Sequence, residues 1–398
     1  MHIVIHTQIN KINATQWNRL LSDNNPFMRH EYLDGLEQCR CVSADTGWQP
    51  SHIAAYKDES QSVLLGVMPC YLKTNSYGEY IFDWAWADAH YRHGMEYYPK
   101  LTNAIPFTPA TGERWLVDTD NSNYNEVSHA LIDAALNLVD QENLSSMHCL
   151  FVNQNQFNFL GKKQFSQRIS NQFHWRNQDY RTFDDFLAKM SSKKRKNIKR
   201  ERRRVQESNI QYRWITGDDL NDDHAKQMYH FYQRTINYYG AQSYLNSEFY
   251  QYLASYFRSN TLFLFAYYEE QVIAGGLYFI SNDCLYGRYW GALNNFHSVH
   301  FETCYYQAIE WCINNGFQRF EAGAQGEHKL ARGLEPTQTY SCHWISHPQF
   351  RNAINEFLGH EKDQTARYSE AMLSHSPFKS HDSSLESSHP DHKRDVET

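Results

Sequence analysis

Short similar sequences occur in the same order in the two halves of this 398-residue chain, and this repetition constrains the fold more than any other feature. Residues 54–59 (AAYKDE) resemble residues 265–270 (FAYYEE), and Gly66 and Gly275 follow them within apolar runs. The further matched pairs are 77–80 with 286–290, 97–101 with 305–309, and 110–113 (ATGE) with 324–327 (AQGE). The period is near half the chain, too long for a solenoid, so the sequence predicts two similar domains.

The second half has the clearer pattern of elements. Aromatic and β-branched runs at residues 262–268, 272–280 and 284–290 are separated by short polar segments and predict three antiparallel strands. Apolar residues at helical spacing predict helices at 223–239 and 247–257, with Ser247 as the N-cap of the latter. A third helix is expected from residue 305 to Gly316, followed by a strand at 317–322. This order of elements is that of the GNAT acyltransferase fold.

The first half gives a similar but weaker pattern. We expect a helix at 30–38, strands within 52–73 and at 79–86, and a helix at 93–104. The predicted class is α/β of the α+β kind: two tandem GNAT-like domains with mixed, mainly antiparallel sheets flanked by helices. The expected divisions are an N-terminal domain at 1–165, a C-terminal domain at 166–350 and a polar, disordered tail at 351–398, which has few apolar residues.

Residues 320–336 (FEAGAQGEHKLARGLEP) have the composition of an active-site loop. Glycines let backbone N–H groups approach a ligand closely, and Lys or Arg neutralises a carboxylate or phosphate. A Glu or His can take the proton that an attacking amine must lose. The catalytic candidates are Glu327, His328, Glu302 and Glu321. The substrate-binding candidates are Gly323, Gln325, Gly326, Lys329, Arg332, His300 and Trp290. Capping, ion-pair or core-packing roles are the alternative for these residues.

A basic segment at residues 193–204 (KKRKNIKRERRR) carries nine cations and one anion in a chain whose formal net charge is −7. The capping-box spacing of Thr182 and Asp185 predicts a helix start just before it, and the basic helix is expected within 183–207. Two interpretations remain: a solvated helix paired with the acidic remainder, or a site for a phosphate-rich partner such as RNA. The phosphate or RNA candidates are Lys193, Lys194, Arg195, Lys196, Lys199, Arg200 and Arg203.

Several strings resemble a known family between residues 26 and 344. They include 47–52 (GWQPSH), 82–87 (FDWAWA), 106–112, 191–203, 288–291 (RYWG), 300–306 and 320–333. On these strings the chain resembles the bacterial FemAB-like N-acyltransferases. The resemblance implies a tandem GNAT-like fold and transfer of an acyl or aminoacyl group to an amine acceptor. It does not imply an established substrate, because the family is largely assigned by analogy with Fem transferases, which use aminoacyl-tRNA to build peptidoglycan cross-bridges. A role in cell-wall peptide metabolism with an aminoacyl-tRNA-like donor is the expectation that this analogy offers.

The sequence after the predicted strand at 284–290 helps to choose between classes of acyl donor. Acetyl-CoA enzymes of this fold usually place a glycine-rich loop after the fourth strand, and residues 291–300 here contain the single glycine Gly291. An aminoacyl-tRNA or another polyphosphate-bearing donor is therefore favoured. The alternatives are a CoA-dependent small-molecule N-acyltransferase and a noncatalytic RNA-binding protein.

No cofactor or metal is expected, because no Cys and His set has zinc-like spacing and His297 with His300 makes only two ligands. No apolar run reaches the length of a membrane span, and no signal peptide is visible. The protein is therefore expected to be cytoplasmic.

Overall fold

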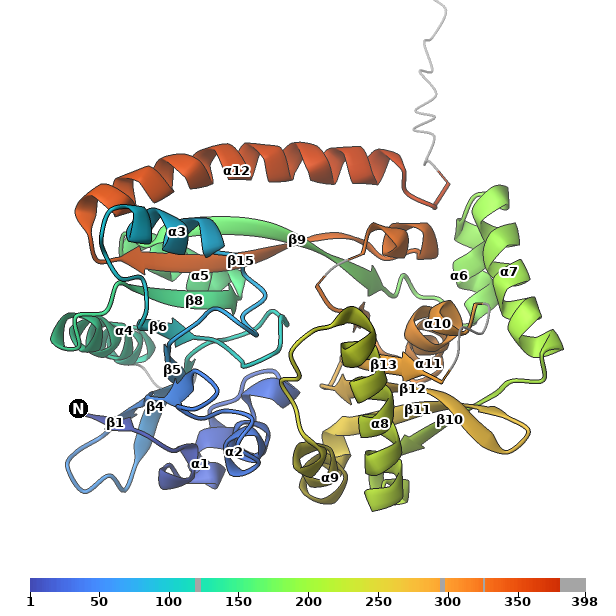
Figure 1. Cartoon of the computed structure of the whole chain (residues 1–398), viewed down its shortest axis with the longest axis horizontal. Helices are drawn as coiled ribbons and strands as arrows, with labels where there is room; N and C mark the ends of the chain where they lie inside the picture. The colour runs from blue at the N-terminus through green and yellow to red at the C-terminus, as the bar shows by residue number, and fades with distance from the viewer. Residues whose placement is uncertain (119–122, 294–297, 325, 380–398) are drawn as a thin grey trace, which may run out of the picture.

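The computed structural model describes residues 1–118, 123–293, 298–324 and 326–379 (Figure 1). Within them, eleven strands form one sheet that runs through both halves of the molecule. The strands in spatial order are β10 (Gln211–Thr216), β11 (Thr261–Tyr268), β12 (Gln271–Ile280), β13 (Cys284–Ala292), β14 (Arg319–Glu321), β9 (Ser166–Arg176), β15 (Glu335–Ile345), β8 (Ser146–Val152), β6 (Lys100–Asn103), β5 (Cys70–Lys73) and β2 (Trp48–Pro50). A smaller sheet has the order β1 (His2–His6), β3 (His52–Tyr56), β4 (Leu64–Met68) and β7 (Leu116–Val117).

Both sheets are mainly antiparallel, as predicted. The described parallel ladders are β13 with β14 and β6 with β8, one in each half. In both cases a helical connection joins the two strands, as a parallel pair requires. The last strand, β15, inserts between β9 and β8 and pairs Cys342 with Cys149. The end of the chain thus returns to the first half.

Helices cover both faces of the second-half strands. On one face lie α8 (Asp222–Tyr239) and α9 (Ser247–Tyr256), together with α2 (His30–Gln38) of the first half, around a core that contains Phe249 and Phe279. On the other face lie α6 (Phe183–Lys189), α7 (Ser192–Glu207), α10 (Val299–Phe301), the π-helical turn η5 (Glu302–Tyr306) and α11 (Gln307–Asn314). The remaining helices are η1 (Ile9–Lys11), α1 (Ala14–Arg19), η2 (Pro26–Met28), α3 (Trp84–Arg92), α4 (Tyr124–Gln141), α5 (Gln154–Lys162), η3 (Gly217–Asp219), η4 (Arg258–Asn260), η6 (Glu327–Arg332) and α12 (Pro348–Ser374).

Local signals explain most of the second-half boundaries. Thr182 and Asp185 form the predicted capping box at the start of α6, with Asp185 N donating to Thr182 Oγ1 at 3.1 Å and Thr182 N to Asp185 at 2.9 Å. The three predicted strands appear as β11, β12 and β13. Helix α9 is capped by Asn246 rather than Ser247, because the Asn246 side chain accepts the N–H of Phe249.

Two first-half predictions are wrong. Residues 84–92 form α3, where a strand was expected, and residues 100–103 form β6, where a helix was expected. The alternation of Trp84 and Trp86 with alanines imitates a strand, although only Trp86 is buried. Strand β6 is buried at all four positions, so it lacks the alternation that identifies a half-exposed strand.

The prediction of a disordered tail from residue 351 is also wrong as far as Ser374, because α12 extends to that residue. The helix lies along β9 and β15 (Figure 1) and buries only Ile354 and Leu358. Polar contacts supply the rest of its attachment: Arg168 forms an ion pair with Glu361 at 2.7 Å, and Asn171 donates to Ser369 at 2.7 Å. Contacts between residues so far apart in the sequence cannot be predicted from amino-acid composition. Residues 380–398 lie outside the described part of the chain. Among the described residues, no helix combines the length and apolar character needed to cross a membrane.

Gly291 has a packing role at the contact between β13 and α8. A Cβ atom at this position would lie 2.0 Å from the backbone oxygen of Phe231. We expect Gly291→Ala to lower the free energy of unfolding by about 1–3 kcal/mol, because the strand and helix must separate. Urea denaturation measures this, with Gly359→Ala on α12 as the control, since no heavy atom lies within 4 Å of its added methyl group. Equal stability of the two variants would contradict the packing role.

Candidate active site

Strands β13 and β14 pair only at their first three positions and then diverge. The ladder joins Cys284 to Arg319, Leu285 to Phe320 and Tyr286 to Glu321. Beyond it a cavity of about 320 Å³ opens between the two strands. Its lining includes Arg288, Tyr289 and Trp290 of β13, Ala322, Gly323 and Ala324 after β14, His300, Cys304 and Tyr305 from the helical side, and His328 and Lys329 of η6. We call this space the central cavity.

Lys329 is the most unusual group of the central cavity. It is only 3% exposed, and its Nζ donates a hydrogen bond to the carbonyl oxygen of Gly323 at 2.9 Å. Within the described residues no carboxylate forms an ion pair with it. Burial lowers the pKa of Lys329 to about 8, and the nearby charge of Arg288 acts in the same direction. A substantial fraction of this amine is therefore neutral near pH 8 and able to accept a proton.

Two histidines line the same cavity. The His328 imidazole Nε2 lies 2.8 Å from the hydroxyl of Tyr305, and the His300 ring packs on Trp290 with centroids 4.4 Å apart. Burial lowers the pKa of both histidines, to about 4 for His300, and the charge of Arg332 adds to each shift. Neutral imidazoles at neutral pH keep one N–H donor and one acceptor each.

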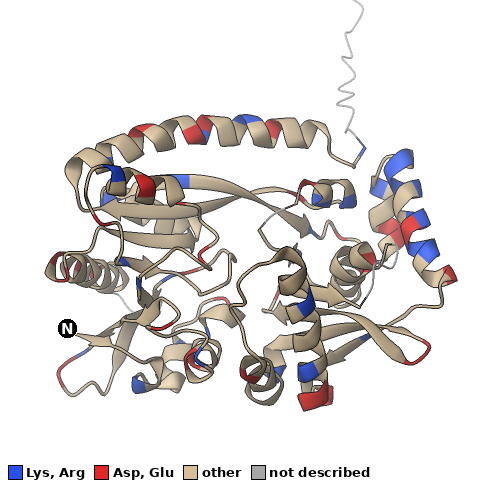
Figure 2. Ribbon diagram, viewed as in Figure 1, with Lys and Arg blue, Asp and Glu red and all other residues tan. Residues whose placement is uncertain are grey.

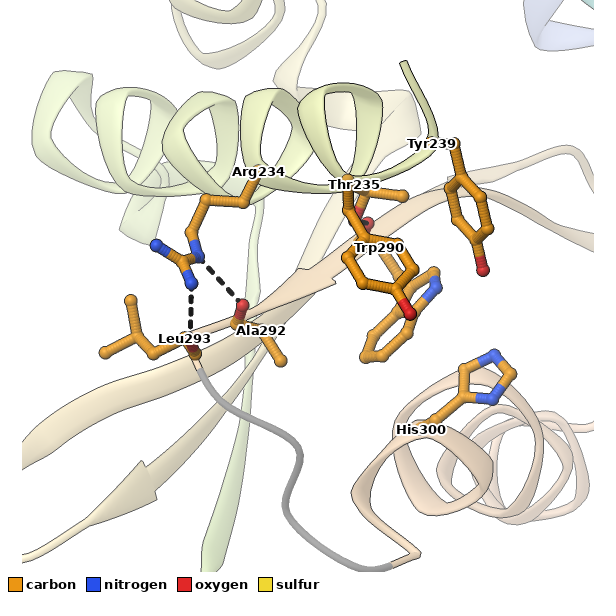
Figure 3. A pocket seen from close by; sticks show the side chains of 8 residues that line it. Arg234, Thr235, Tyr239, Trp290, Ala292, Leu293 and His300 are labelled. Atoms are coloured by element: carbon orange, nitrogen blue, oxygen red, sulfur yellow. Dashed lines mark hydrogen bonds between the residues drawn. The ribbon is translucent and has the colours of Figure 1, made fainter. Parts of the chain in front are cut away.

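A second cavity, of about 520 Å³, adjoins the central one (Figure 3). The two share the lining residues Tyr239, Trp290 and His300 and are therefore neighbours. Figure 3 shows Arg234 of α8 bonded to the end of β13, with its guanidinium donating to the carbonyl oxygens of Ala292 at 3.0 Å and Leu293 at 2.5 Å. These bonds fix α8 over the cavity and direct its C-terminal tyrosines toward the opening.

The first half contributes to a third space, which we call the aromatic groove. It has a volume of about 270 Å³, and Ala324 lines both this groove and the central cavity. Its aromatic residues are Tyr77, Tyr80, Phe82 and Trp84 of the first half and Tyr244 of the second. The two halves also meet at Arg288, which donates to the carbonyl oxygen of Phe107. The segment after β14 therefore lies between two concave surfaces, one from each half.

Of the candidates in residues 320–336, His328, Lys329 and Gly323 line the central cavity. Glu327 turns outward instead and accepts a hydrogen bond from Tyr368 of α12 at 2.9 Å. Arg332 is held away from the cavity lining by an ion pair with Glu201 at 3.3 Å and lies 3.3 Å above the ring of Phe301. Gly326 has a φ of 120°, and a Cβ atom there would lie 2.7 Å from the ring of His328, so glycine permits the turn into η6. Gln325 lies outside the described residues.

The two other catalytic candidates lie elsewhere. Glu302 is buried under α7, where Arg202 bonds it at 3.1 Å and Gln307 at 2.8 Å, a structural ion pair. Burial raises the pKa of Glu302, and Arg202 opposes that shift. Glu321 lines a different cavity. Trp290 and His300 line the central cavity.

Sequence reasoning missed Arg288, Tyr305 and Tyr239. Arg288 and Tyr305 belong to the family-like strings 288–291 and 300–306, and these strings could have pointed to them. No pattern pointed to Tyr239, because nothing in the local sequence distinguishes an exposed tyrosine at a helix end from a tyrosine in the core. Tyr239 is 74% exposed.

Helix α7 carries the basic segment along the edge of the second half (Figure 2). Ile198 and Val205 are buried on its inner side, as their spacing predicts. Glu201 points inward to Arg332 and thereby connects α7 to η6. Five basic candidates are exposed and two are partly exposed; in chain order the set is Lys193, Lys194, Arg195, Lys196, Lys199, Arg200 and Arg203. The outer side of α7 is thus strongly positive, and its inner side contacts η6.

The chain was compared with known proteins. A model of the FemAB-like family, described as peptidoglycan biosynthesis/recognition, matches residues 8–380. The structure of FemX has a TM-score of 0.51 at 10% identity, over 89% of this chain and all of that one. The structure of L-PGS from Bacillus licheniformis has a TM-score of 0.49 at 9% identity, over 82% of this chain and 95% of that one. The structure of a tandem GNAT protein from the clavulanic acid biosynthesis pathway has a TM-score of 0.44 at 8% identity, over 87% of this chain and 99% of that one. The comparison with curated proteins gave no match. At such identity, the likeness to FemX shows the fold alone.

Proposed function

Because this chain belongs to the FemAB-like family, we propose that it is an N-acyltransferase whose reaction takes place in the central cavity, with Lys329 as the general base. The observation that carries the proposal is the buried amine of Lys329, which lines the cavity beyond the β13–β14 ladder and has no carboxylate partner in the described part of the chain. Groups with such shifted pKa values in a cavity are candidates for proton transfer.

The reaction follows from the groups around that amine. The acceptor nitrogen attacks the donor carbonyl carbon and forms the C–N bond, while the bond from that carbon to the leaving group breaks. The excess proton of the acceptor nitrogen passes to Lys329 Nζ and then to the leaving group. Arg288, which lines the cavity, stabilises the negative charge that develops on the carbonyl oxygen. Neutral His328 and Tyr305 orient the reactants by hydrogen bonds.

We infer further that the donor is an aminoacyl-tRNA or a similar polyphosphate-bearing ester. The position of α7 supports this, because its inner side contacts η6 through the ion pair of Glu201 and Arg332, while its outer side carries the exposed cations. The family description favours an acceptor amine from peptidoglycan synthesis. Aminoacyl-tRNA is an intracellular molecule, so this donor implies a cytoplasmic protein.

Filter binding of total tRNA over a salt series tests the donor. We expect log K to fall steeply with log salt for the wild type, and the slope to decrease by about three when Lys193, Lys196, Lys199 and Arg200 are replaced with glutamine. A matched control replaces Lys57, Lys162, Lys226 and Arg258, which changes the net charge equally on other surfaces. Salt-insensitive binding, or equal loss in both variants, would remove tRNA as the donor. Thermal stabilisation by CoA without any effect of tRNA would favour the CoA-dependent alternative.

A further inference from the structure

A polar cavity of about 480 Å³ lies where β9, β14 and β15 approach Thr111 and Gln154 of the first half. None of its lining residues lines the central cavity. Its charged lining residues are Glu321, Arg176 and Arg319, with His174 beside them. The proposed transfer reaction uses none of these groups, so this cavity requires its own explanation.

Glu321 is the central group of this cavity. It is 4% exposed, and among the described residues no N–H or O–H group donates a hydrogen bond to its carboxylate. The basic nitrogens within 4 Å of it are Arg319 Nε at 3.5 Å and His174 Nδ1 at 4.0 Å. Burial lowers the pKa of His174 to about 3, so this ring is neutral and contributes no charge. A buried carboxylate without donors is costly unless a ligand supplies them.

The open side of the cavity carries the opposite charge. No described carboxylate forms an ion pair with Arg176, and the Arg319 side chain is 31% exposed. The hydroxyl of Thr111 is buried and has no hydrogen-bond partner among the described groups. Guanidinium and hydroxyl groups are donors suited to a carboxylate. The cavity thus offers a buried acceptor for a cation beside donors for an anion, of which the guanidinium groups are the more exposed.

We propose that this cavity binds a free α-amino acid, with the ligand ammonium on Glu321 and the ligand carboxylate on Arg176, Arg319 and Thr111. An α-amino acid carries both charges within one small molecule, which matches opposite charges lining one cavity. This site is independent of the proposed transferase reaction. Because its walls come from both halves, occupancy stabilises their contact.

Isothermal titration calorimetry and thermal unfolding with a panel of L-amino acids at neutral pH test the site. We expect at least one of them to bind and to raise Tm, because a ligand that binds only the folded state stabilises it. Its N-acetyl derivative lacks the ammonium, and its amide lacks the carboxylate, so each is expected to bind at least about tenfold more weakly, since each loses a charge-assisted contact.

Proton release gives a second readout. Burial raises the pKa of Glu321 to about 7, against the opposing charges of Arg319, Arg288, Arg176 and Arg114. A bound ammonium favours the ionised carboxylate, so binding at pH 7 should release part of a proton. Titrations in buffers of different ionisation enthalpy detect it.

Variants decide whether the binding belongs to this cavity. Glu321→Gln should abolish the proton release and weaken binding at least about tenfold, since the charge-assisted contact is lost. Arg176→Gln, at a more exposed position, should also weaken binding and provides the test if Glu321→Gln does not fold. Lys329→Met should bind the amino acid unchanged, which separates this site from the transferase proposal. Absence of binding at millimolar concentration, or unchanged binding in Arg176→Gln and Glu321→Gln, would overturn the assignment.

Discussion

Replacing Lys329 with methionine is expected to lower kcat/KM for acyl transfer by about 10²–10⁴-fold, the usual contribution of a positioned general base. Methionine retains the length and apolar stem of the side chain but cannot accept a proton. In the wild type, kcat/KM should rise with pH through about 8, where the amine loses its charge, and the variant should lack this rise. The measurement is transfer of a labelled aminoacyl group to an amine acceptor over a pH series.

The stability of the same variant provides a check that needs no substrate. The pKa of Lys329 is lowered in the folded protein, so the unfolded chain binds more protons between pH 8 and the ordinary lysine value near 10.5. The free energy of unfolding of the wild type should therefore gain a contribution of about 3 kcal/mol as pH rises through this window. Lys329→Met should lack this contribution.

Glu327→Gln is the matched control for this prediction. Glu327 lies two residues earlier on η6, but its carboxylate contacts Tyr368 of α12. We expect kcat/KM to stay within about twofold of the wild type, because an exposed hydrogen bond contributes little. A large loss of transfer in Glu327→Gln with normal activity in Lys329→Met would reverse the assignment of the base.

The contrast between these two residues shows what the sequence could and could not predict about the site. The composition of residues 320–336 singled out a segment from which Gly323, His328 and Lys329 line the central cavity, and Lys329 was among its binding candidates. The choice of Glu327 as a base failed to anticipate where the side chain points. That direction depends on η6 being a 3₁₀ helix and on α12, which is more than twenty residues away in the chain.

The matched strings of the two halves differ in how much they say about the structure. Residues 54–59 and 265–270 begin within β3 and β11 and extend past their ends, and each of these strands lies between two antiparallel neighbours. Residues 110–113 lie between β6 and β7, and residues 324–327 lie between β14 and the first residue of η6. Glycine and acidic residues recur wherever a chain must turn, so such a short match carries less weight than the matching order of strands. The second-half strands were predictable since their apolar runs are bounded by polar turns, whereas α3 and β6 lack distinctive patterns.

The largest stability effect is expected at Lys100, which is fully buried in the first half. Its Nζ donates to Glu79 at 2.8 Å, to Asp83 at 2.5 Å and to Ser76 at 2.8 Å. Lys100→Met would leave two buried carboxylates without their cation, and we expect the free energy of unfolding to fall by about 3–5 kcal/mol. Urea denaturation at pH 7 measures this loss.

An ion pair on the surface shows whether the loss of stability comes from the burial of the charges or from the lost ion pair itself. Lys163 bonds Asp133 at 2.7 Å, a similar distance, but the two side chains are 24% and 56% exposed. Lys163→Met should cost at most about 1 kcal/mol, because water solvates the remaining carboxylate. Adding Glu79→Gln and Asp83→Asn to Lys100→Met should recover part of the stability, since the uncompensated charges are then removed. If Lys100→Met and Lys163→Met lost equal stability, the buried carboxylates would not be the origin of the effect.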